Sequence, residues 1–119
     1  MLVKKTNPQL IELVKVLQKA SRKNCAPIWS AILRSLLKSR EHMAQVNVGR
    51  IARVTRGGDT VAVPGKVLGS GRINHQITVA ALSFSSTAVK RITSAGGRCI
   101  AIGKLLEENP RGNNVKIIR

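Results

Sequence analysis

Acidic and aromatic side chains are scarce in this sequence of 119 residues. Five aspartates and glutamates stand against 21 lysines and arginines, which gives a net charge of +16 at pH 7. A compact domain with this imbalance repels itself and is stabilised by a polyanion that neutralises it. The candidate polyanions are RNA, DNA and acidic membrane surfaces. Trp29 and Phe84 are the only aromatic residues, so we expect an aliphatic core, and a hydrophobic content of 43% argues against a disordered chain.

Long apolar runs are also missing. No run of about 18 apolar residues is available to cross a bilayer, and the first ten residues, MLVKKTNPQL, contain no apolar signal-peptide core. We therefore expect a cytoplasmic protein with no membrane partner. Cys25 and Cys99 lie far apart, with no Cys-x-x-Cys motif and no histidine at zinc-binding spacing. We interpret them as two buried, reduced thiols, and we predict neither a disulfide nor a metal site.

Enzyme motifs are absent as well. Residues 63–75, VPGKVLGSGRINH, are rich in glycine, but Asn74 occupies the place of the third glycine of a dinucleotide-binding loop. The Gly65-Lys66 pair is followed by Val67, where a P-loop requires serine or threonine. No G-x-S-x-G motif occurs, and so few acids make a catalytic carboxylate pair hard to build. We predict no enzyme activity, no cofactor and no small-molecule substrate.

Two amphipathic helices are predicted in the first third of the chain. Asn7 suits an N-cap and Pro8 a first helical position, and leucines and valines follow at helical spacing to about Ser21. Pro27 begins a second helix, in which apolar residues repeat every three to four positions. We expect Trp29, on that apolar face, to pack in the core.

From residue 45 the pattern changes to short strands and helices. The predicted order is a strand at 46–48, a helical turn at 50–54, a glycine turn at 56–59, a strand that stops at Pro64, and a strand at 75–84. A helix at 86–95 follows, capped by Ser85 or Ser86 and ended by Gly96, with four buried residues: Ala88, Val89, Ile92 and Ala95. The last segments are predicted as a buried strand (RCIAI), a short helix (GKLLEEN) stopped before Pro110, and a strand or tail (VKIIR).

Alternation of strands and helices indicates an α/β fold with some parallel pairing. The length fits one domain, residues 1–119. We divide it into a basic helical N-terminal part, residues 1–44, and an α/β RNA-binding core, residues 45–119.

Basic residues occur on almost every predicted element. On a surface that is merely solvated, acids would normally balance them, but this chain has few acids. Three arginines recur at every third position around the glycine turn, and a lysine and an arginine flank the glycine-rich stretch. Glycines there let the main chain lie against a crowded nucleic-acid backbone. The candidate nucleic-acid-binding residues are Lys4, Lys5, Asn47, Arg50, Arg53, Arg56, Lys66, Gly69, Gly71, Arg72 and His75.

The kind of nucleic acid is constrained by what is missing. Sequence-tolerant single-strand binders stack bases on aromatic rings, which this chain almost lacks. Recognition by phosphate, sugar and shape remains, and it fits folded RNA. Two alternatives stay open at this point: a protein that compacts DNA or RNA in general, and an enzyme with an anionic substrate.

Four segments, in order, resemble one family. KTNPQL, VNVGRIARVTRGGDTVAVPGKVLGSG, TVAALSFSSTAVKRITSAGG and ENPRGNNVKIIR are similar to large-subunit ribosomal proteins of the archaeal and eukaryotic L-eighteen-e type. That family shares a superfamily with the bacterial large-subunit protein L-fifteen, and the likeness covers residues 5–119. It implies an irregular superhelix of β-β-α turns preceded by two amphipathic helices, and a structural place in the large subunit of the cytoplasmic ribosome.

The same resemblance implies partners and site residues. The partners would be large-subunit ribosomal RNA and neighbouring large-subunit ribosomal proteins, with no catalysis and no cofactor. The segments NVGRIAR and VPGKVLGSG would lie near RNA, and the latter is expected to form a loop. Carried over to this sequence, that expectation concerns Asn47, Arg50, Arg53, Lys66 and Arg72.

Overall fold

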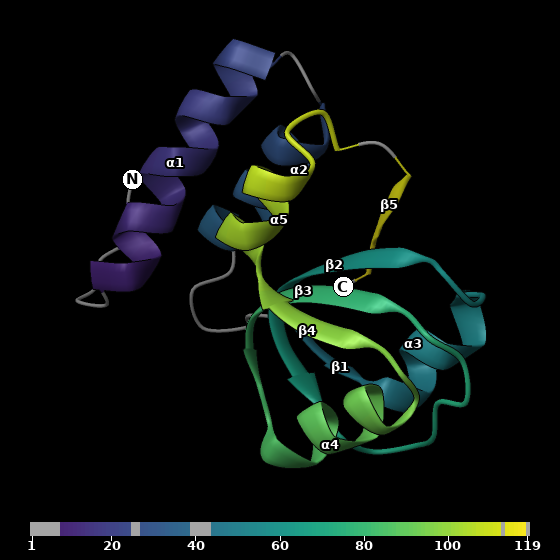
Figure 1. Ribbon diagram of the computed structural model, residues 1–119. Coiled ribbons are helices and arrows are strands. Elements are labelled where there is room, and N and C mark those ends of the chain that lie inside the picture. Colours follow the sequence, from purple (N-terminus) through teal and green to yellow (C-terminus); the bar gives the residue numbers. More distant parts are fainter. Residues whose placement is uncertain (1–7, 25–26, 39–43, 113, 119) are drawn as a thin grey trace.

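The computed structural model describes residues 8–24, 27–38, 44–112 and 114–118, which form a parallel sheet between two layers of helices (Figure 1). The elements, in chain order, are α1 (Pro8–Asn24), α2 (Pro27–Lys38), β1 (Ala44–Asn47), α3 (Val48–Val54), β2 (Thr60–Leu68), β3 (Thr78–Phe84), α4 (Ser86–Ser94), β4 (Arg98–Ala101), α5 (Ile102–Glu108) and β5 (Val115–Ile117). The predicted α/β fold, with two helices before the strands, is confirmed.

The two leading helices begin at proline, as predicted. Proline suits the first helical position because its missing N–H would have no partner inside the helix. Helix α1 continues to Asn24, three residues beyond the predicted end. The predicted N-cap, Asn7, lies outside the described residues. Trp29 on α2 is fully buried, which confirms its place in the core.

The strands are arranged in the order β1-β2-β3-β4, and all of their pairings are parallel. The chain therefore advances by one strand at each crossover, and winds as a superhelix. The crossovers contain α3, then a loop of residues 69–77, then α4. The superhelix is irregular because this middle crossover has no helix.

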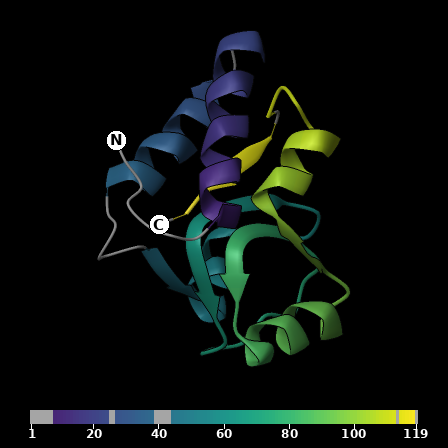
Figure 2. The ribbon, with the colours of Figure 1, turned by 90° about the vertical axis from the view of Figure 1, so that its left-hand side faces the viewer.

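The last crossover runs the other way. Strands β5 and β1 pair with the same side of β2. Strand β5 pairs with the first half of β2, and β1 pairs with its second half. Parallel crossovers are right-handed, so a crossover that moves back across the sheet places its helix on the opposite face. Helix α5 accordingly joins α1 and α2, whereas α3 and α4 lie on the other side of the sheet (Figures 1 and 2).

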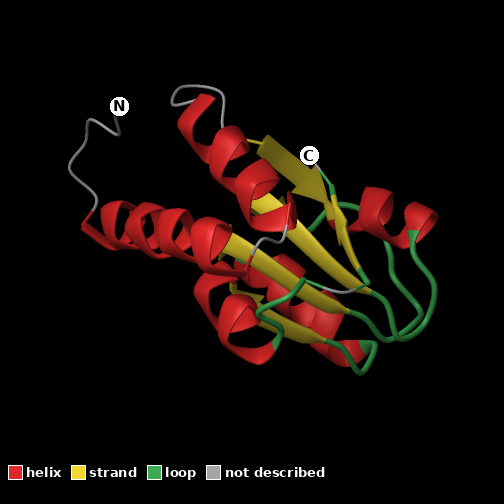
Figure 3. Cartoon of the chain, turned by 90° about the horizontal axis from the view of Figure 1, so that it is seen from above, coloured by secondary structure: helices red, strands yellow, loops and turns green. Residues whose placement is uncertain are grey.

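Each face of the sheet has its own hydrophobic core. Alternate residues of β2 and β3, such as Val61, Val63 and Val79, pack with α3 and α4. The residues between them, Ala62 and Ala80, belong to the core formed with α1, α2 and α5. Small alanine side chains let these helices lie close against the strands, and Figure 3 shows the helices of this layer in front of the sheet.

Strand β2 does not stop at Pro64 but continues to Leu68, so that prediction is wrong. The pairing of β2 with β3 shifts between Val63 and Lys66, because β2 has one extra residue there. On the other edge, β5 pairs only as far as Ala62 and β1 begins at Gly65. On the side of β3, Pro64 thus lies in the bulge. On the other side of β2, it lies in the gap between the end of β5 and the start of β1. Its missing N–H therefore breaks no hydrogen bond of either ladder.

The continuation of β2 to Leu68 also overturns the expectation that the VPGKVLGSG segment forms a loop. Most of the VPGKVLGSG segment is strand and not loop, because the loop begins only after Leu68. Strand β1 also begins earlier than predicted, at Ala44, and α3 begins at Val48, where the buried Val48 side chain packs in the core beside β2.

Helix α4 confirms its predicted cap and corrects its predicted face. The Ser85 side chain accepts a hydrogen bond from the Ala88 amide, at 3.1 Å. Ala88 and Ile92, one turn apart, are buried, but Val89 is 37% exposed because it lies beside this stripe. Ala95 is half-buried.

Strand β4 is half-buried and not buried as predicted. It lies at the edge of the sheet and pairs with β3 alone among the described strands. Cys99, on this strand, is a free thiol and is only half-buried; burial raises its pKa. Cys25 lies outside the described residues.

Candidate nucleic-acid interface

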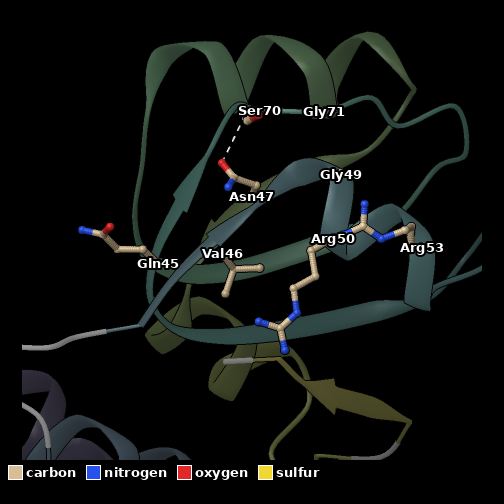
Figure 4. A pocket seen from close by; sticks show the side chains of 8 residues that line it. All are labelled: Gln45, Val46, Asn47, Gly49, Arg50, Arg53, Ser70 and Gly71. Carbon is tan, nitrogen blue, oxygen red and sulfur yellow. Dashed lines mark hydrogen bonds between the residues drawn. The ribbon is translucent and has the colours of Figure 1, made fainter.

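A glycine loop, residues 69–71, lies between the first turns of α3 and α4. The Gly49 amide of α3 donates a hydrogen bond to the Ser70 carbonyl, at 2.9 Å. Asn47, at the N-cap position of α3, makes no cap bond; its Oδ1 accepts from the Ser70 amide instead, at 3.3 Å (Figure 4). These two bonds fix the loop to the end of β1.

Glycine is required at the points of closest contact. Gly71 has a φ of +94°, a region that side chains disfavour, and a Cβ there would lie 2.5 Å from the Gly49 Cα. A Cβ on Gly69 would lie 2.5 Å from the Thr87 Cβ and 2.9 Å from the Ala88 amide nitrogen, in the first turn of α4. The loop is therefore fitted between two helices by backbone contact.

Beside the loop is a pocket of about 380 Å³. Arg50 and Arg53, one helical turn apart on α3, line it together with the main chain of the loop (Figure 4). Both arginines are exposed. The residues that line the pocket are Gln45, Val46, Asn47, Gly49, Arg50, Arg53, Ser70 and Gly71.

A second pocket, of about 230 Å³, lies where the segment after the loop faces α4. Arg72 comes from this segment, and Lys90 and Arg91 come from α4. The Arg91 Nη1 also donates a hydrogen bond to the Gly71 carbonyl, which ties α4 to the loop. The lining residues are Arg72, Ile73, Asn74, Lys90, Arg91 and Ser94.

No acidic residue is among the described residues that line the two pockets. The ion pairs among the described residues lie elsewhere. Arg98 and Lys104 face Glu108, at 2.9 and 4.0 Å, and Lys116 faces Asp59, at 3.2 Å. The ion pairs among the described residues thus include none of the cations that line the two pockets.

Hydrogen bonds and nearby cations lower the pKa values of two carboxyl groups. The pKa of Asp59 is lowered, first by the backbone N–H of Arg56, which donates to its Oδ2, and then by Lys116. The pKa of Glu108 is lowered chiefly by the hydrogen bonds from Arg98. Asp59 therefore stabilises the turn after α3, and Glu108 joins α5 to β4.

The structure brings together most of the predicted binding residues of the middle segment. Asn47, Arg50 and Arg53 lie on one side of the glycine loop, and Arg72 lies on the other. Gly69 and Gly71 form the loop itself. Lys4 and Lys5 lie outside the described residues. The binding of RNA by each of these residues stays a prediction.

Lys66 and Arg56 stand apart from this cluster. Lys66 is exposed on β2, in register with Gln45 and Ser83, and neighbouring strand residues point to opposite faces. Since Val67 packs in the core with α3 and α4, Lys66 faces the other side of the sheet. Arg56 is exposed in the turn after α3 and lines neither pocket.

His75 has a partner within the fold. Its Nε2 lies 2.8 Å from the Thr55 hydroxyl, which donates to the Ile51 carbonyl at 2.8 Å. The hydroxyl proton is therefore used, and Nε2 acts as the donor to Thr55. The ring is half-buried and ties the segment after the loop to the end of α3.

Sequence reasoning missed Ser70, Lys90 and Arg91. The helical period of α4 indicates that Lys90 and Arg91 lie off the buried face of Ala88 and Ile92. Their place beside the loop depends on the crossover from β3 to β4, which no local pattern specifies. No group of three or more potential metal ligands occurs among the described residues, and no helix in them is long and apolar enough to cross a membrane.

Comparisons with known proteins decide the family. Residues 2–119 match the family model described as "Ribosomal protein 60S L18 and 50S L18e". The chain belongs to this L18 and L18e family. Curated relatives, each called "Large ribosomal subunit protein eL18", include that of Methanospirillum hungatei, 51% identical over 97% of this chain and 95% of the relative. Those of Methanothermobacter thermautotrophicus and Archaeoglobus fulgidus are 47% and 46% identical, over 98% of this chain and 96% and 99% of their own lengths.

The L18 and L18e assignment confirms the resemblance seen in the sequence. The match covers the helical N-terminal part as well as the sheet. The curated relatives are archaeal ribosomal proteins and not enzymes, and this confirms the prediction that the chain is not an enzyme.

Proposed function

We propose that the chain is a structural constituent of the large subunit of the cytoplasmic ribosome, and that it binds folded ribosomal RNA with the surface around the glycine loop. Its relatives are named as large-subunit proteins. The observation that carries the RNA-binding surface is the loop at residues 69–71, fixed between α3 and α4, with cations on both sides and no acid among the described residues that line the two pockets. Other large-subunit proteins are the expected neighbours.

The chemistry of this surface suits phosphate. Arginine presents a planar fork of donors that matches phosphate oxygens, and Arg50, Arg53 and Arg72 offer it from two segments held by the loop. No aromatic residue lines either pocket, so bases have no ring to stack on. Binding by backbone charge and shape follows, and a folded RNA supplies both.

The test is a charge-matched pair of variants. In the site variant Arg50, Arg53 and Arg72 are changed to glutamine. In the control Arg34, Lys104 and Arg111 are changed to glutamine; all three are exposed and line neither pocket. Both variants lose three charges, so a difference between them reports position and not net charge. Circular dichroism and thermal midpoints check that both fold.

Affinity for large-subunit ribosomal RNA is measured across a series of salt concentrations. We expect the site variant to bind more weakly, and the slope of log affinity against log salt to fall by about 2, with a smaller change in the control. Equal losses in both variants would contradict the proposed surface. Duplex DNA that binds the parent chain as tightly as the RNA does would favour the alternative, a general compacting protein.

A further inference from the structure

A second basic surface lies on α1, across the sheet from the glycine loop. Helix α1 packs against α2 and α5 and buries Val14, Leu17 and Ala20. Its outer side is exposed, and Lys15, Lys19 and Lys23 recur along it at intervals of four residues. Figures 1 and 2 show α1 on the outside of the molecule, where none of the described helices and strands covers that side.

This lysine row opposes the stability of its own helix. Like charges four residues apart repel one another, and Glu12 is the one acid on α1. The helix dipole favours Lys23 in the last turn, but Lys15 and Lys19 lie too far from that end to benefit. The ion pairs found between described residues include none of the three lysines. A bound polyanion would remove the repulsion.

We propose that the lysine row binds the phosphate backbone of a second RNA segment, so that one chain joins two separate segments of folded RNA. Four helical residues advance by about 6 Å, so the ammonium groups are spaced closely enough to follow successive phosphates of one strand. Lysine contacts phosphate as a point charge and needs no fixed geometry. The inference rests on the proposed function and adds the second segment to it.

The two surfaces face different sides of the molecule. The sheet, with α2 and α5 on it, stands between the lysine row and the glycine loop (Figure 1), in a body of 38 × 28 × 19 Å. A single straight duplex cannot lie along both surfaces. A folded RNA that presents one segment to each surface is held by two linked contacts, and each contact raises the effective concentration at the other.

The direct experiment is cross-linking of the full chain bound to large-subunit ribosomal RNA. A photoreactive residue replaces Gln18, which is exposed beside the lysine row, or Asn74, which lines the second pocket. Cross-linked nucleotides are mapped by sequencing. We expect two sets of nucleotides that lie far apart in the RNA sequence. The K15Q/K19Q/K23Q variant should lose the set from position 18, keep the set from position 74, and bind the intact RNA at least about tenfold more weakly.

Other outcomes overturn the inference in distinguishable ways. RNA cross-links from position 74 without any from position 18 would leave the proposed function standing and remove the second surface. Cross-links from both positions to the same nucleotides would mean one segment and no bridging. Cross-links from position 18 alone would contradict the glycine-loop surface and the bridging together.

A second readout needs no RNA. Because the lysines repel one another, K15Q/K19Q/K23Q should raise the thermal midpoint of the free protein at low salt, and the difference should shrink as salt screens the charges. The R34Q/K104Q/R111Q chain is the control with the same loss of charge, and a smaller rise is expected for it because its three positions form no row and Lys104 faces Glu108 at 4.0 Å. A lower midpoint for the lysine variant would show that these side chains stabilise the fold, and would contradict the charge repulsion from which the inference is argued.

Discussion

Gly71 lies against Gly49 so closely that a Cβ on Gly71 would come within 2.5 Å of the Gly49 Cα. This contact joins the loop after β2 to the first turn of α3. Gly71 also has a φ of +94° and accepts a hydrogen bond at its carbonyl from Arg91 of α4. One glycine thus fixes the separation of the segments that present Arg50, Arg53 and Arg72.

Replacing Gly71 by alanine should therefore damage both stability and binding. The positive φ and the contact with Gly49 predict a loss of about 1–3 kcal/mol in the free energy of unfolding, together with weaker binding of ribosomal RNA. Chemical denaturation and the salt-series binding assay measure the two effects. Gly57→Ala is the control, because its Cβ would meet nothing closer than the His75 Cβ at 3.9 Å. If the two variants were equally stable, the close contact would not constrain the loop.

Gly103 offers the opposite case. It lies in α5, and a Cβ there would meet nothing within 4 Å. Gly103→Ala should raise the free energy of unfolding by about 0.5–1 kcal/mol, because alanine restricts the unfolded chain and favours the helix. Gly97→Ala should instead lower the free energy of unfolding, since its Cβ would collide with the Ile77 carbonyl oxygen. Denaturation midpoints measured side by side test both signs, and a stabilised Gly97→Ala chain would contradict the packing described.

Glu108 predicts a dependence of stability on pH. Its pKa is lowered in the folded chain by Arg98, so the folded state holds the proton less tightly than the unfolded state does. The stabilisation is therefore fully present above the ordinary value of 4.5 and is lost as pH falls through the lowered pKa. Glu108→Gln should be less stable than the parent at pH 7, and the difference should shrink below about pH 4.5.

Thermal unfolding over a range of pH measures this difference. Glu107→Gln is the matched control, because it removes the same charge from the neighbouring residue, which joins no ion pair among the described residues. A parent-minus-Glu108→Gln difference that stays constant from pH 7 to pH 3 would contradict the contribution of the Arg98–Glu108 pair.

Trp29 allows a test of domain organisation. We propose that residues 1–119 unfold as one domain, because α1 and α2 share a core with β2, β3 and α5. Trp29 is the only tryptophan; it is fully buried, and its Nε1 donates to the Pro110 carbonyl at 2.6 Å. Its fluorescence therefore reports the helical layer, whereas far-ultraviolet circular dichroism reports the whole chain. The two unfolding transitions should coincide, and separate midpoints would mean that the helical layer unfolds on its own.

Local patterns in the sequence predict much of the fold. Pro8 and Pro27 mark helix starts, Ser85 marks a cap, and the alternation after residue 45 indicates parallel strands. Pro64 misleads because its effect depends on which strands lie beside it. The bulge against β3 and the gap between β5 and β1 are properties of the sheet, and a single strand's sequence does not specify them.

The candidate site is predictable only in part for the same reason. Arg50, Arg53 and Arg72 are found from charge and spacing, but Lys66 faces the other side of the sheet and His75 bonds to Thr55. Lys90 and Arg91 reach the glycine loop because α4 follows β3 on the same face as α3. Which basic residues gather around the loop is therefore decided by the crossovers of the fold.

The most direct test of the central claim is sedimentation of a lysate from the native host through a sucrose gradient at high salt, with the chain followed by mass spectrometry. High salt strips polycations that are held only by loose charge contacts. A built-in constituent of the large subunit should still migrate with that subunit. Release to the top of the gradient, or migration with chromatin, would contradict the claim and leave a general nucleic-acid-binding protein.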